Sequence, residues 1–153
     1  MSKYLSIFIV AVTLLLAGCR SDIVYSRFDN IPSGQWHTDS IVRFEVPITD
    51  TKASYRTIVY VRHTERYPYQ NMWLYIGNGN TTRRDTIEFY LADDRGRWLG
   101  DSHNGFIEMP VLIDENRQFK QAGTYVFEVQ HGLRDSVLRG ISDVGFEVIR
   151  VEE

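Results

Sequence analysis

Apolar and polar side chains alternate residue by residue in several short stretches of this 153-residue chain. Residues 42–48, 124–130 and 145–151 show the alternation most clearly, and a period of two is typical of half-buried β-strands. Residues 55–63 carry bulky side chains on both faces, which predicts a central strand. Pro47 lacks a backbone N–H and predicts an edge position for the first strand. Because no long stretch beyond the N-terminal region has helical periodicity, the pattern indicates an all-β fold.

A β-hairpin is predicted in the middle of the chain. Two stretches rich in apolar and aromatic residues, 72–76 and 86–91, lie on either side of the Gly-Asn-Gly-Asn sequence at 77–80. Glycine and asparagine favour the tight turns that join antiparallel strands. Residues 93–96 predict a further turn, after which the chain is expected to return toward the body of the domain.

The fold class follows from the number and spacing of these segments. Residues 101–122 are the least regular, with a short strand predicted at 109–113 and a helical turn at 116–121. About seven to eight short strands, with turn signals roughly every eight to twelve residues and no βαβ rhythm, favour an antiparallel β-sandwich, Ig-like or jelly-roll-like. A closed barrel is the alternative. We expect one such domain over residues 39–153.

The first 18 residues have the composition of a lipoprotein signal peptide. Lys3 supplies a basic head, residues 5–16 form an apolar run too short for a stable membrane span, and small residues at 17–18 precede Cys19. We expect cleavage before Cys19 and attachment of acyl chains such as palmitate to its thiol. At roughly 0.8 kcal/mol per buried methylene, two or three chains hold a protein firmly at a membrane.

The expected result is a protein exported from the cytoplasm and anchored by lipid in the cell envelope, with the inner and outer membranes both open. Residues 19–38 are then expected to form the lipidated N-terminus and a tether. The alternatives are an ordinary secreted protein with a chance cysteine, and an uncleaved membrane helix, which the polar residues 20–22 disfavour.

Charge and cysteine content exclude several classes of protein. The chain has 17 basic and 20 acidic side chains, a formal charge of −3, so we expect no nucleic-acid partner. Cys19 is the only cysteine, and acylation consumes its thiol. Neither a disulfide nor a thiolate metal site is therefore expected.

Sites for metals and cofactors are not expected either. The four histidines fall in separate segments without the spacing of a zinc motif. Asp93, Asp94 and Gly96 resemble part of a calcium loop, but Arg95 and Arg97 stand where oxygen ligands would be needed. A turn closed by an aspartate explains this segment better. The histidines are His37, His63, His103 and His131.

Catalysis is likewise not expected. The chain has no nucleophile elbow and no phosphate-binding glycine loop. Glu88 and Glu128 are the best candidates for a paired-carboxylate glycosidase site, but both occupy polar positions of alternating strands. A glutamate in such a position ordinarily faces solvent, so we interpret the chain as a binding protein and not an enzyme.

Aromatic residues gather around the predicted hairpin, and exposed aromatics on a sandwich edge can stack on sugars or contact a partner protein. At least half of them are expected in the core. Pro68 stiffens its loop, so Tyr67 and Tyr69 are the preferred exposed pair. The predicted contact residues are Tyr67, Tyr69, Trp73 and Trp98, with Tyr75 in the same cluster.

Several motifs occur in a characteristic order along the chain, at Ile31-Pro32 with Gly34 and Trp36, at 67–71, at 91–93 with 96–100, at 123–125 with 131–134, and at 143–145. Together they resemble the gliding-motility lipoprotein GldH family, from about residue 23 to the C-terminus. The resemblance implies an envelope lipoprotein needed for gliding motility, in cells with a dedicated protein secretion machine, and it supplies no catalytic residues. The expected partners are membrane lipid and other envelope, gliding or secretion proteins. A glycan-binding envelope lipoprotein is the alternative.

Three Asp-Ser or Asp-Thr pairs followed by an apolar residue match the triplet used for O-linked glycans in the bacterial group that this family resembles. The candidate glycosylation sites are Ser40, Thr86 and Ser136. The alternative is structural, because such pairs commonly end turns before a β-branched residue opens a strand.

Overall fold

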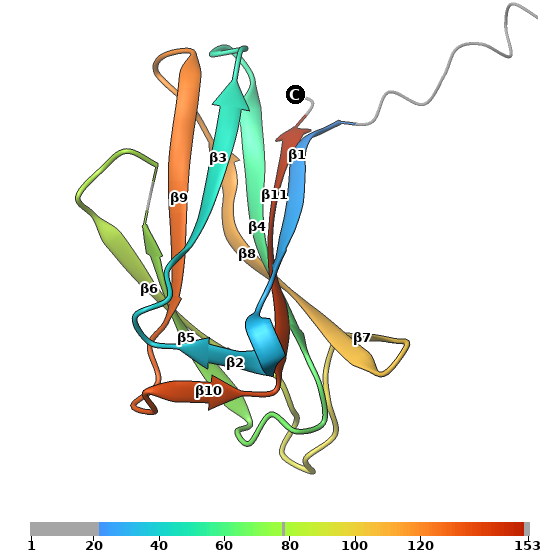
Figure 1. Ribbon diagram of the computed structural model, residues 1–153. Helices are drawn as coiled ribbons and strands as arrows, with labels where there is room; N and C mark the ends of the chain where they lie inside the picture. The colour runs from blue at the N-terminus through green and yellow to red at the C-terminus, as the bar shows by residue number, and fades with distance from the viewer. Residues whose placement is uncertain (1–21, 78, 152–153) are drawn as a thin grey trace, which may run out of the picture.

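The computed structural model describes residues 22–77 and 79–151, which form eleven strands and one short 3-10 turn (Figure 1). None of the described helical structure is long and apolar enough to cross a membrane. In chain order the elements are β1 (Ile23–Asn30), η1 (Pro32–Gly34), β2 (Gln35–His37), β3 (Val42–Ile48), β4 (Ser54–His63), β5 (Asn71–Gly77), β6 (Arg84–Tyr90), β7 (Asp101–His103), β8 (Phe106–Arg117), β9 (Gly123–His131), β10 (Val137–Arg139) and β11 (Ile141–Val151).

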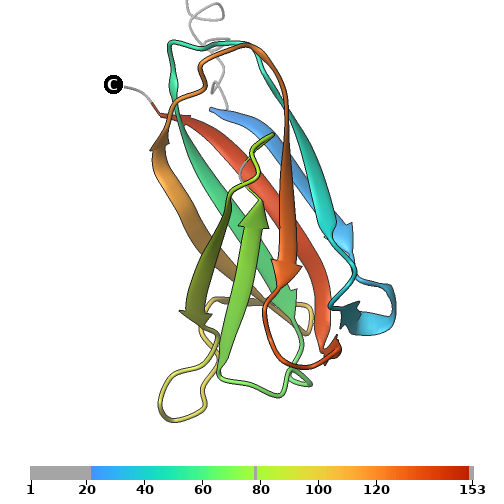
Figure 2. The ribbon, with the colours of Figure 1, turned by 90° about the vertical axis from the view of Figure 1, so that its left-hand side faces the viewer.

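Two antiparallel sheets face each other and confirm the predicted β-sandwich (Figure 2). One sheet has the order β1-β11-β4-β8-β7 and the other the order β3-β9-β5-β6. A separate two-stranded ribbon, β10-β2, lies across one end. The described strands exceed the seven to eight predicted, chiefly because β2, β7 and β10 have only three residues each, too few for a periodic pattern.

The alternating residues of the predicted strands fill the space between the sheets. Phe146 of β11 stacks against Phe44 of β3 and Phe127 of β9, with ring centroids 5.5 and 4.6 Å apart. All three rings are completely buried, so they join the two sheets through the centre of the core. The structure also confirms Pro47 on an edge strand and β4 in the interior of its sheet.

The boundary of the sandwich lies earlier in the chain than residue 39. β1 pairs with β11 along its length, from Ile23 opposite Ile149 to Asn30 opposite Asp143, and Trp36 is fully buried. Residues 23–37, expected in the tether, are therefore part of the domain. Their side chains give little sign of it, because β1 is held by backbone pairing and its mostly exposed positions show no alternation. The predicted signal peptide and Cys19 lie outside the described residues.

The irregular segment 101–122 contains one long strand. β8 runs through both the predicted short strand at 109–113 and the start of the predicted helical turn at 116–121, so the helical turn is wrong. Register shifts opposite residues 55–58 of β4 interrupt the two-residue period, which is why the pattern is weak here. Pro110 is tolerated because β7 pairs only with residues 106–108.

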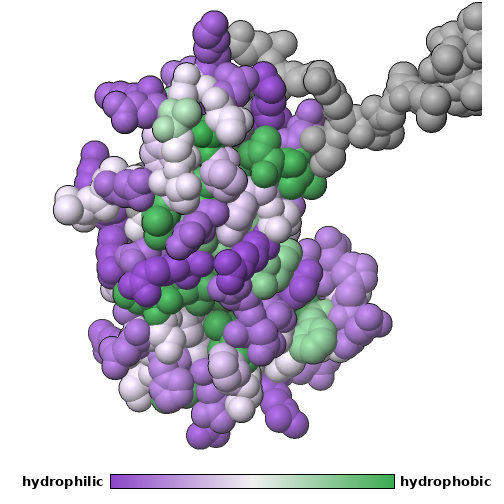
Figure 3. Space-filling view, turned by 45° about the horizontal axis from the view of Figure 1, so that its top comes forward, coloured by the Kyte–Doolittle hydropathy of each residue, from purple (hydrophilic) through white to green (hydrophobic). Residues whose placement is uncertain are grey.

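The two ends of the sandwich differ in construction. We call the end where β1 begins and β11 ends the proximal end, and the opposite end the distal end. At the proximal end, short turns at 49–53 and 118–122 join the strands. At the distal end lie η1, the β10-β2 ribbon and the longer loops 64–70, 91–100 and 132–136. With the proximal end turned toward the viewer, hydrophilic residues cover most of the surface, and hydrophobic residues form small separate groups (Figure 3).

Candidate functional site

A cleft of about 580 Å³ opens at the distal end of the β3-β9-β5-β6 sheet, on its outer face. We call it the aromatic cleft, because three aromatic side chains form much of its wall. The loop that follows β9 forms the opposite wall. Its lining residues are Tyr69, Trp73, Tyr75, Thr86, Gly132, Leu133, Arg134 and Asp135.

The strand geometry of β5 places two of the aromatics side by side. Trp73 and Tyr75 are two residues apart and share the outer face, while Leu74 and Ile76 between and after them are buried in the core. The two aromatic side chains remain 37% and 38% exposed. Large aromatic side chains exposed next to each other are typical of surfaces that bind sugars or proteins.

Gly132 makes room for both rings. A Cβ atom at this position would lie 3.1 Å from the Tyr75 ring and 3.2 Å from the Cβ of Trp73. The Gly132 N–H donates to the Trp73 carbonyl oxygen at 2.7 Å, which draws the loop after β9 against β5. The aromatic side chains therefore rest against glycine backbone at the floor of the cleft.

A hydrogen bond closes one side of the aromatic cleft. The Tyr69 hydroxyl donates to Oδ2 of Asp135 at 2.5 Å and joins the loop before β5 to the loop after β9. This hydrogen bond to a carboxylate raises the pKa of Tyr69, so the phenol stays protonated and keeps donating. Arg134, the neighbour of Asp135, adds a cation to the same wall.

Tyr67 was expected to be exposed with Tyr69, and this prediction is wrong. The Tyr67 side chain is only 3% exposed and belongs to the core. Its hydroxyl donates to the Asn71 carbonyl oxygen at 2.7 Å, which satisfies the polar end of the ring in the interior. Burial raises its pKa far above the ordinary value. The loop around Pro68 thus turns Tyr67 inward and Tyr69 outward.

Trp98 is half-buried and does not line the aromatic cleft. Its ring packs edge-to-face on His63, with centroids 4.7 Å apart, and borders a separate hollow of about 360 Å³. Of the predicted contact residues, Tyr69 and Trp73 therefore meet in the cleft, whereas Tyr67 and Trp98 lie elsewhere. Tyr75, although noted with the cluster, was missing from the predicted contact set; its two-residue spacing from Trp73 was the available signal.

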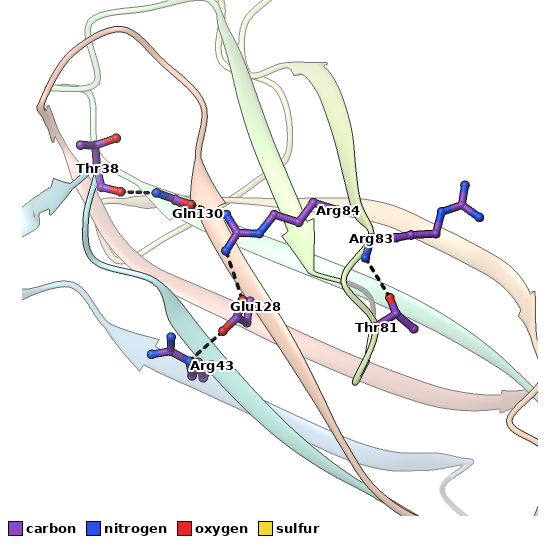
Figure 4. A network of polar contacts seen from close by, with 7 residues as sticks. All are labelled: Thr38, Arg43, Thr81, Arg83, Arg84, Glu128 and Gln130. Carbon is purple, nitrogen blue, oxygen red and sulfur yellow. Dashed lines mark hydrogen bonds and ion pairs between the residues drawn. The ribbon is translucent and has the colours of Figure 1, made fainter. Parts of the chain in front are cut away.

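Charged residues cover the outer face of the same sheet next to the cleft (Figure 4). Glu128 of β9 bonds Arg43 of β3 at 2.9 Å and Arg84 of β6 at 3.3 Å. Arg84 also donates to Gln130 at 3.0 Å. The network joins three strands across the sheet, and the Glu128 carboxylate forms ion pairs with two guanidinium groups.

The two glutamates considered for sugar hydrolysis are not paired. Glu88 lies opposite Trp73 and Glu128 opposite Gly77, four residues further along β5. At roughly 3.3 Å per residue the offset along the strand is about 13 Å. Glycosidase carboxylates lie about 5 to 9.5 Å apart, so this pair does not fit that chemistry.

The aspartate-rich segment at 93–96 is a turn, as expected. The Asp93 carboxylate accepts hydrogen bonds from the backbone N–H groups of Arg95, at 3.0 Å, and Arg97, at 2.9 Å. Nε of Arg97 donates a third at 2.8 Å. These bonds lower the pKa of Asp93 and use its oxygens within the turn.

Two of the histidines are buried at the distal end. His63 bonds the Thr64 carbonyl oxygen through Nδ1 at 3.1 Å, and neither ring nitrogen of His131 makes a hydrogen bond with a described residue. Burial lowers the pKa of both rings, so they are neutral at pH 7. Among residues 22–77 and 79–151, no group of three or more metal-binding side chains is arranged to hold an ion.

The three candidate glycosylation sites are all exposed. Ser40 and Ser136 lie in distal turns, and Thr86 lies on β6 at the edge of the aromatic cleft. Their exposure permits modification, and glycosylation stays a prediction.

Comparisons with known proteins agree with the resemblance found in the motifs. The family model described as GldH lipoprotein matches residues 23–148. The gliding motility lipoprotein GldH of Flavobacterium johnsoniae is 28% identical over 150 residues, which cover 92% of each chain. The gliding motility lipoprotein GldH homolog of Christiangramia forsetii is 30% identical over 160 residues, 97% of each chain.

Proposed function

The chain belongs to the GldH lipoprotein family, and we propose that it acts without catalysis, through contacts with other proteins of the gliding and associated secretion apparatus. It is a gliding-related lipoprotein anchored to a membrane of the cell envelope. In this proposal Cys19 carries the acyl chains and the aromatic cleft carries the contact.

The exposed aromatics in a rigid setting are the observation that supports a contact role. Trp73 and Tyr75 rest on Gly132, and Tyr69 is fixed by Asp135, so the side chains are already in place before a partner arrives. A partner that covers them gains apolar burial without ordering a loop. Tyrosine and tryptophan in this arrangement are the side chains that dominate binding energy in protein interfaces.

The position of the cleft suits a protein anchored at its N-terminus. Cys19 precedes β1 closely in the chain, and β1 runs from the proximal to the distal end over about 26 Å for its eight residues. An acylated Cys19 would therefore hold the proximal end near the membrane. The aromatic cleft, at the distal end, would then face the partners beyond it.

Partner capture tests the contact surface. The full-length lipoprotein is purified from detergent-solubilised native membranes, and the proteins that co-purify with it are quantified. We expect the double variant Trp73→Ala/Tyr75→Ala to lose at least tenfold in the recovery of these proteins, because it removes both exposed rings. Leu112→Ala is the matched control, since this exposed apolar residue lies on the other sheet. Equal recovery from the double variant and the control would refute the proposal.

Fractionation tests the anchor. We expect Cys19→Ser to move the protein from the membrane fraction to the soluble fraction, because the serine hydroxyl does not accept the diacylglycerol. A serine variant that stays with the membranes would rule out acylation as the anchor. Recovery of the serine variant in the periplasmic fraction would also show that the protein is exported without the lipid.

Glycan binding is the second candidate function, and the polar residues of the aromatic cleft favour it. Asp135 and Arg134 stand beside aromatic faces, the combination that binds sugar hydroxyls and stacks on sugar rings. Retention of the lipoprotein on immobilised envelope polysaccharide, lost in Trp73→Ala/Tyr75→Ala, would support this candidate. Passage through the column with full partner recovery would favour the protein contact.

A further inference from the structure

A second cleft, of about 750 Å³, opens at the distal end where three chain segments meet. It lies where η1 and its flanks approach the loop after β4 and the junction of β10 and β11. We call it the arginine cleft. Its lining residues are Asn30, Ile31, Ser33, Gly34, Gln35, Thr64, Arg66, Phe106, Arg139, Gly140 and Ser142.

The charge of this cleft is one-sided. Arg66 and Arg139 both line it, and no aspartate or glutamate is among its described lining residues. Several arginines on the two large sheets have carboxylate partners, such as Glu128 for Arg43 and Glu108 for Arg62. Neither cleft arginine has an ion pair among residues 22–77 and 79–151.

Two cations that share a cleft without a counter-ion repel each other, and a bound anion relieves that repulsion. The chain as a whole carries a net charge of −3, so this local excess of positive charge is not a property of the general surface. The arrangement favours a negatively charged ligand at this position.

Backbone hydrogen bonds hold the cleft in shape. The Gly140 N–H donates to the Gly34 carbonyl oxygen at 2.9 Å, and the Thr64 N–H donates to the Gly140 carbonyl oxygen at 2.8 Å. Gly140 has a φ of +84°, and a Cβ there would lie 2.5 Å from the Tyr67 nitrogen. Only glycine allows this approach, so the loop that carries Arg66 is fixed against the segment that carries Arg139.

The neighbouring turn adds polar donors and strain. Ser33 has a φ of +57°, an uncommon value for a residue with a side chain, and such strained residues gather at ligand sites. Hydroxyl and amide donors also line the cleft, from Ser33, Thr64 and Gln35. Phe106, 41% exposed, adds an apolar surface at the rim.

We propose that the arginine cleft binds a phosphate group carried by a larger molecule, with the guanidinium groups of Arg66 and Arg139 as the main donors. Guanidinium matches phosphate geometry through paired hydrogen bonds, and the additional hydroxyl and amide donors suit an anion with several oxygens. A cleft of about 750 Å³ leaves space beside the phosphate for its carrier, which Phe106 would contact. The carrier is a sugar phosphate or the head group of a phospholipid.

Calorimetric titration of the full-length lipoprotein in neutral detergent tests the proposal. The probes are inorganic phosphate, glucose 1-phosphate and glycerophosphoglycerol, with glucose as the uncharged control. We expect at least one of the two phosphate esters to bind more tightly than inorganic phosphate. We expect glucose not to bind. Preference for glucose 1-phosphate identifies a sugar phosphate, and preference for glycerophosphoglycerol identifies a lipid head group.

The variants connect binding to the two arginines. We expect Arg66→Gln/Arg139→Gln to weaken phosphate-ester binding by roughly tenfold per arginine, and Arg83→Gln, which removes the same charge outside the cleft, to leave it unchanged. Both cleft arginines are exposed, so the double variant should keep the thermal transition of the parent. Absence of phosphate-ester binding, or equal binding by the double variant, would overturn the proposal. Trp73→Ala/Tyr75→Ala should bind the esters normally, which separates this test from that of the partner contact.

Discussion

The proximal and distal ends of the sandwich share the long strands of both sheets, but they differ in their turns and in their clefts. At the proximal end, Arg150 bonds Asp50 at 2.7 Å, and the Tyr55 hydroxyl donates to the Asp50 carbonyl oxygen at 2.7 Å. At the distal end, His131 is buried without a hydrogen bond to a described residue, and Arg66 and Arg139 share a cleft without a described carboxylate partner. Both named clefts lie at this distal end.

In the proposed function, this difference separates an end that only closes the fold from an end that binds a partner. Short turns with paired charges are sufficient to connect strands. Strained backbone, exposed aromatics and cations without partners are unfavourable in isolation, and they persist because the surrounding structure holds them in place. We therefore expect substitutions at the distal end to reveal larger and more specific effects than substitutions at the proximal end.

The largest effect on stability is expected at Gly140. Gly140→Ala introduces a Cβ within 2.5 Å of backbone, at a φ of +84°. We expect the free energy of unfolding to fall by about 3 kcal/mol, because both the contact and the dihedral angle are unfavourable. Chemical denaturation measures the change.

Gly105 provides the matched control for this substitution. It has a φ of +83° and open space around its missing side chain, so Gly105→Ala should cost only about 1 kcal/mol. Equal losses in the two variants would show that the dihedral angle alone matters and that the segments around Gly140 are free to separate.

A smaller, pH-dependent effect is expected from the buried histidines. Burial lowers the pKa of His63 and His131 below the ordinary value of 6.5, although the Thr64 backbone opposes the shift at His63, and the Trp36 backbone and the charge of Asp135 oppose it at His131. Just below pH 6.5 the unfolded chain then binds more protons than the folded chain, so the free energy of unfolding decreases as the pH falls. Above pH 6.5 these histidines add no pH dependence.

Calorimetric Tm values at pH 7.5 and 5.5 measure this dependence. We expect the difference between the two Tm values to shrink in His131→Phe and again in His63→Phe/His131→Phe. His103→Gln, at an exposed histidine, should keep the parent difference. A double variant with the same pH response as the parent would attribute the acid sensitivity of the distal end to other groups.

A still smaller effect on stability is expected at the wall of the aromatic cleft. Tyr69→Phe removes the hydroxyl that bonds Asp135 and leaves the ring. We expect little change in Tm, because the pair is exposed, but faster backbone amide exchange in the loop 132–136. Unchanged exchange in this loop would show that the Gly132–Trp73 backbone bond alone positions it.

The smallest effect is expected at the proximal end. Arg150→Gln removes an exposed ion pair with Asp50, and such pairs contribute little to stability. The Tm should remain within experimental error of the parent. A clear loss would mean that the two ends are more alike than their construction indicates.

Local sequence patterns predicted much of the sandwich. Val42, Phe44 and Val46 are completely or nearly completely buried, as their alternation required, and Pro47 lies on an edge strand. The pairing of β5 with β6 was also predicted, from two apolar stretches on either side of a glycine-asparagine sequence. β1 was not predicted, because its pairing with β11 joins distant parts of the chain and leaves no periodic signal.

The candidate site was predicted only in part. Trp73 is exposed, as a contact residue must be, because a position on a strand determines which face its side chain takes; its contact with a partner stays a prediction. Tyr67 and Tyr69 could not be separated in this way, because both lie in a loop. The Tyr67 hydroxyl donates a hydrogen bond to the Asn71 carbonyl oxygen in the interior, and the Tyr69 hydroxyl donates one to Asp135 at the surface. The arginine cleft had no sequence signal at all, because Arg66 and Arg139 are far apart in the chain.

The amino-acid sequence alone determined the all-β class, the strands whose two faces differ in polarity, the family and the expected acylation of Cys19. Each of these depends on neighbouring residues or on a contiguous motif. Only the tertiary structure decided which aromatics are exposed, which loops meet and which cations share a cleft. Those outcomes depend on close approaches between distant segments, such as that of Gly140 to the backbone of Tyr67, which a one-dimensional pattern does not contain.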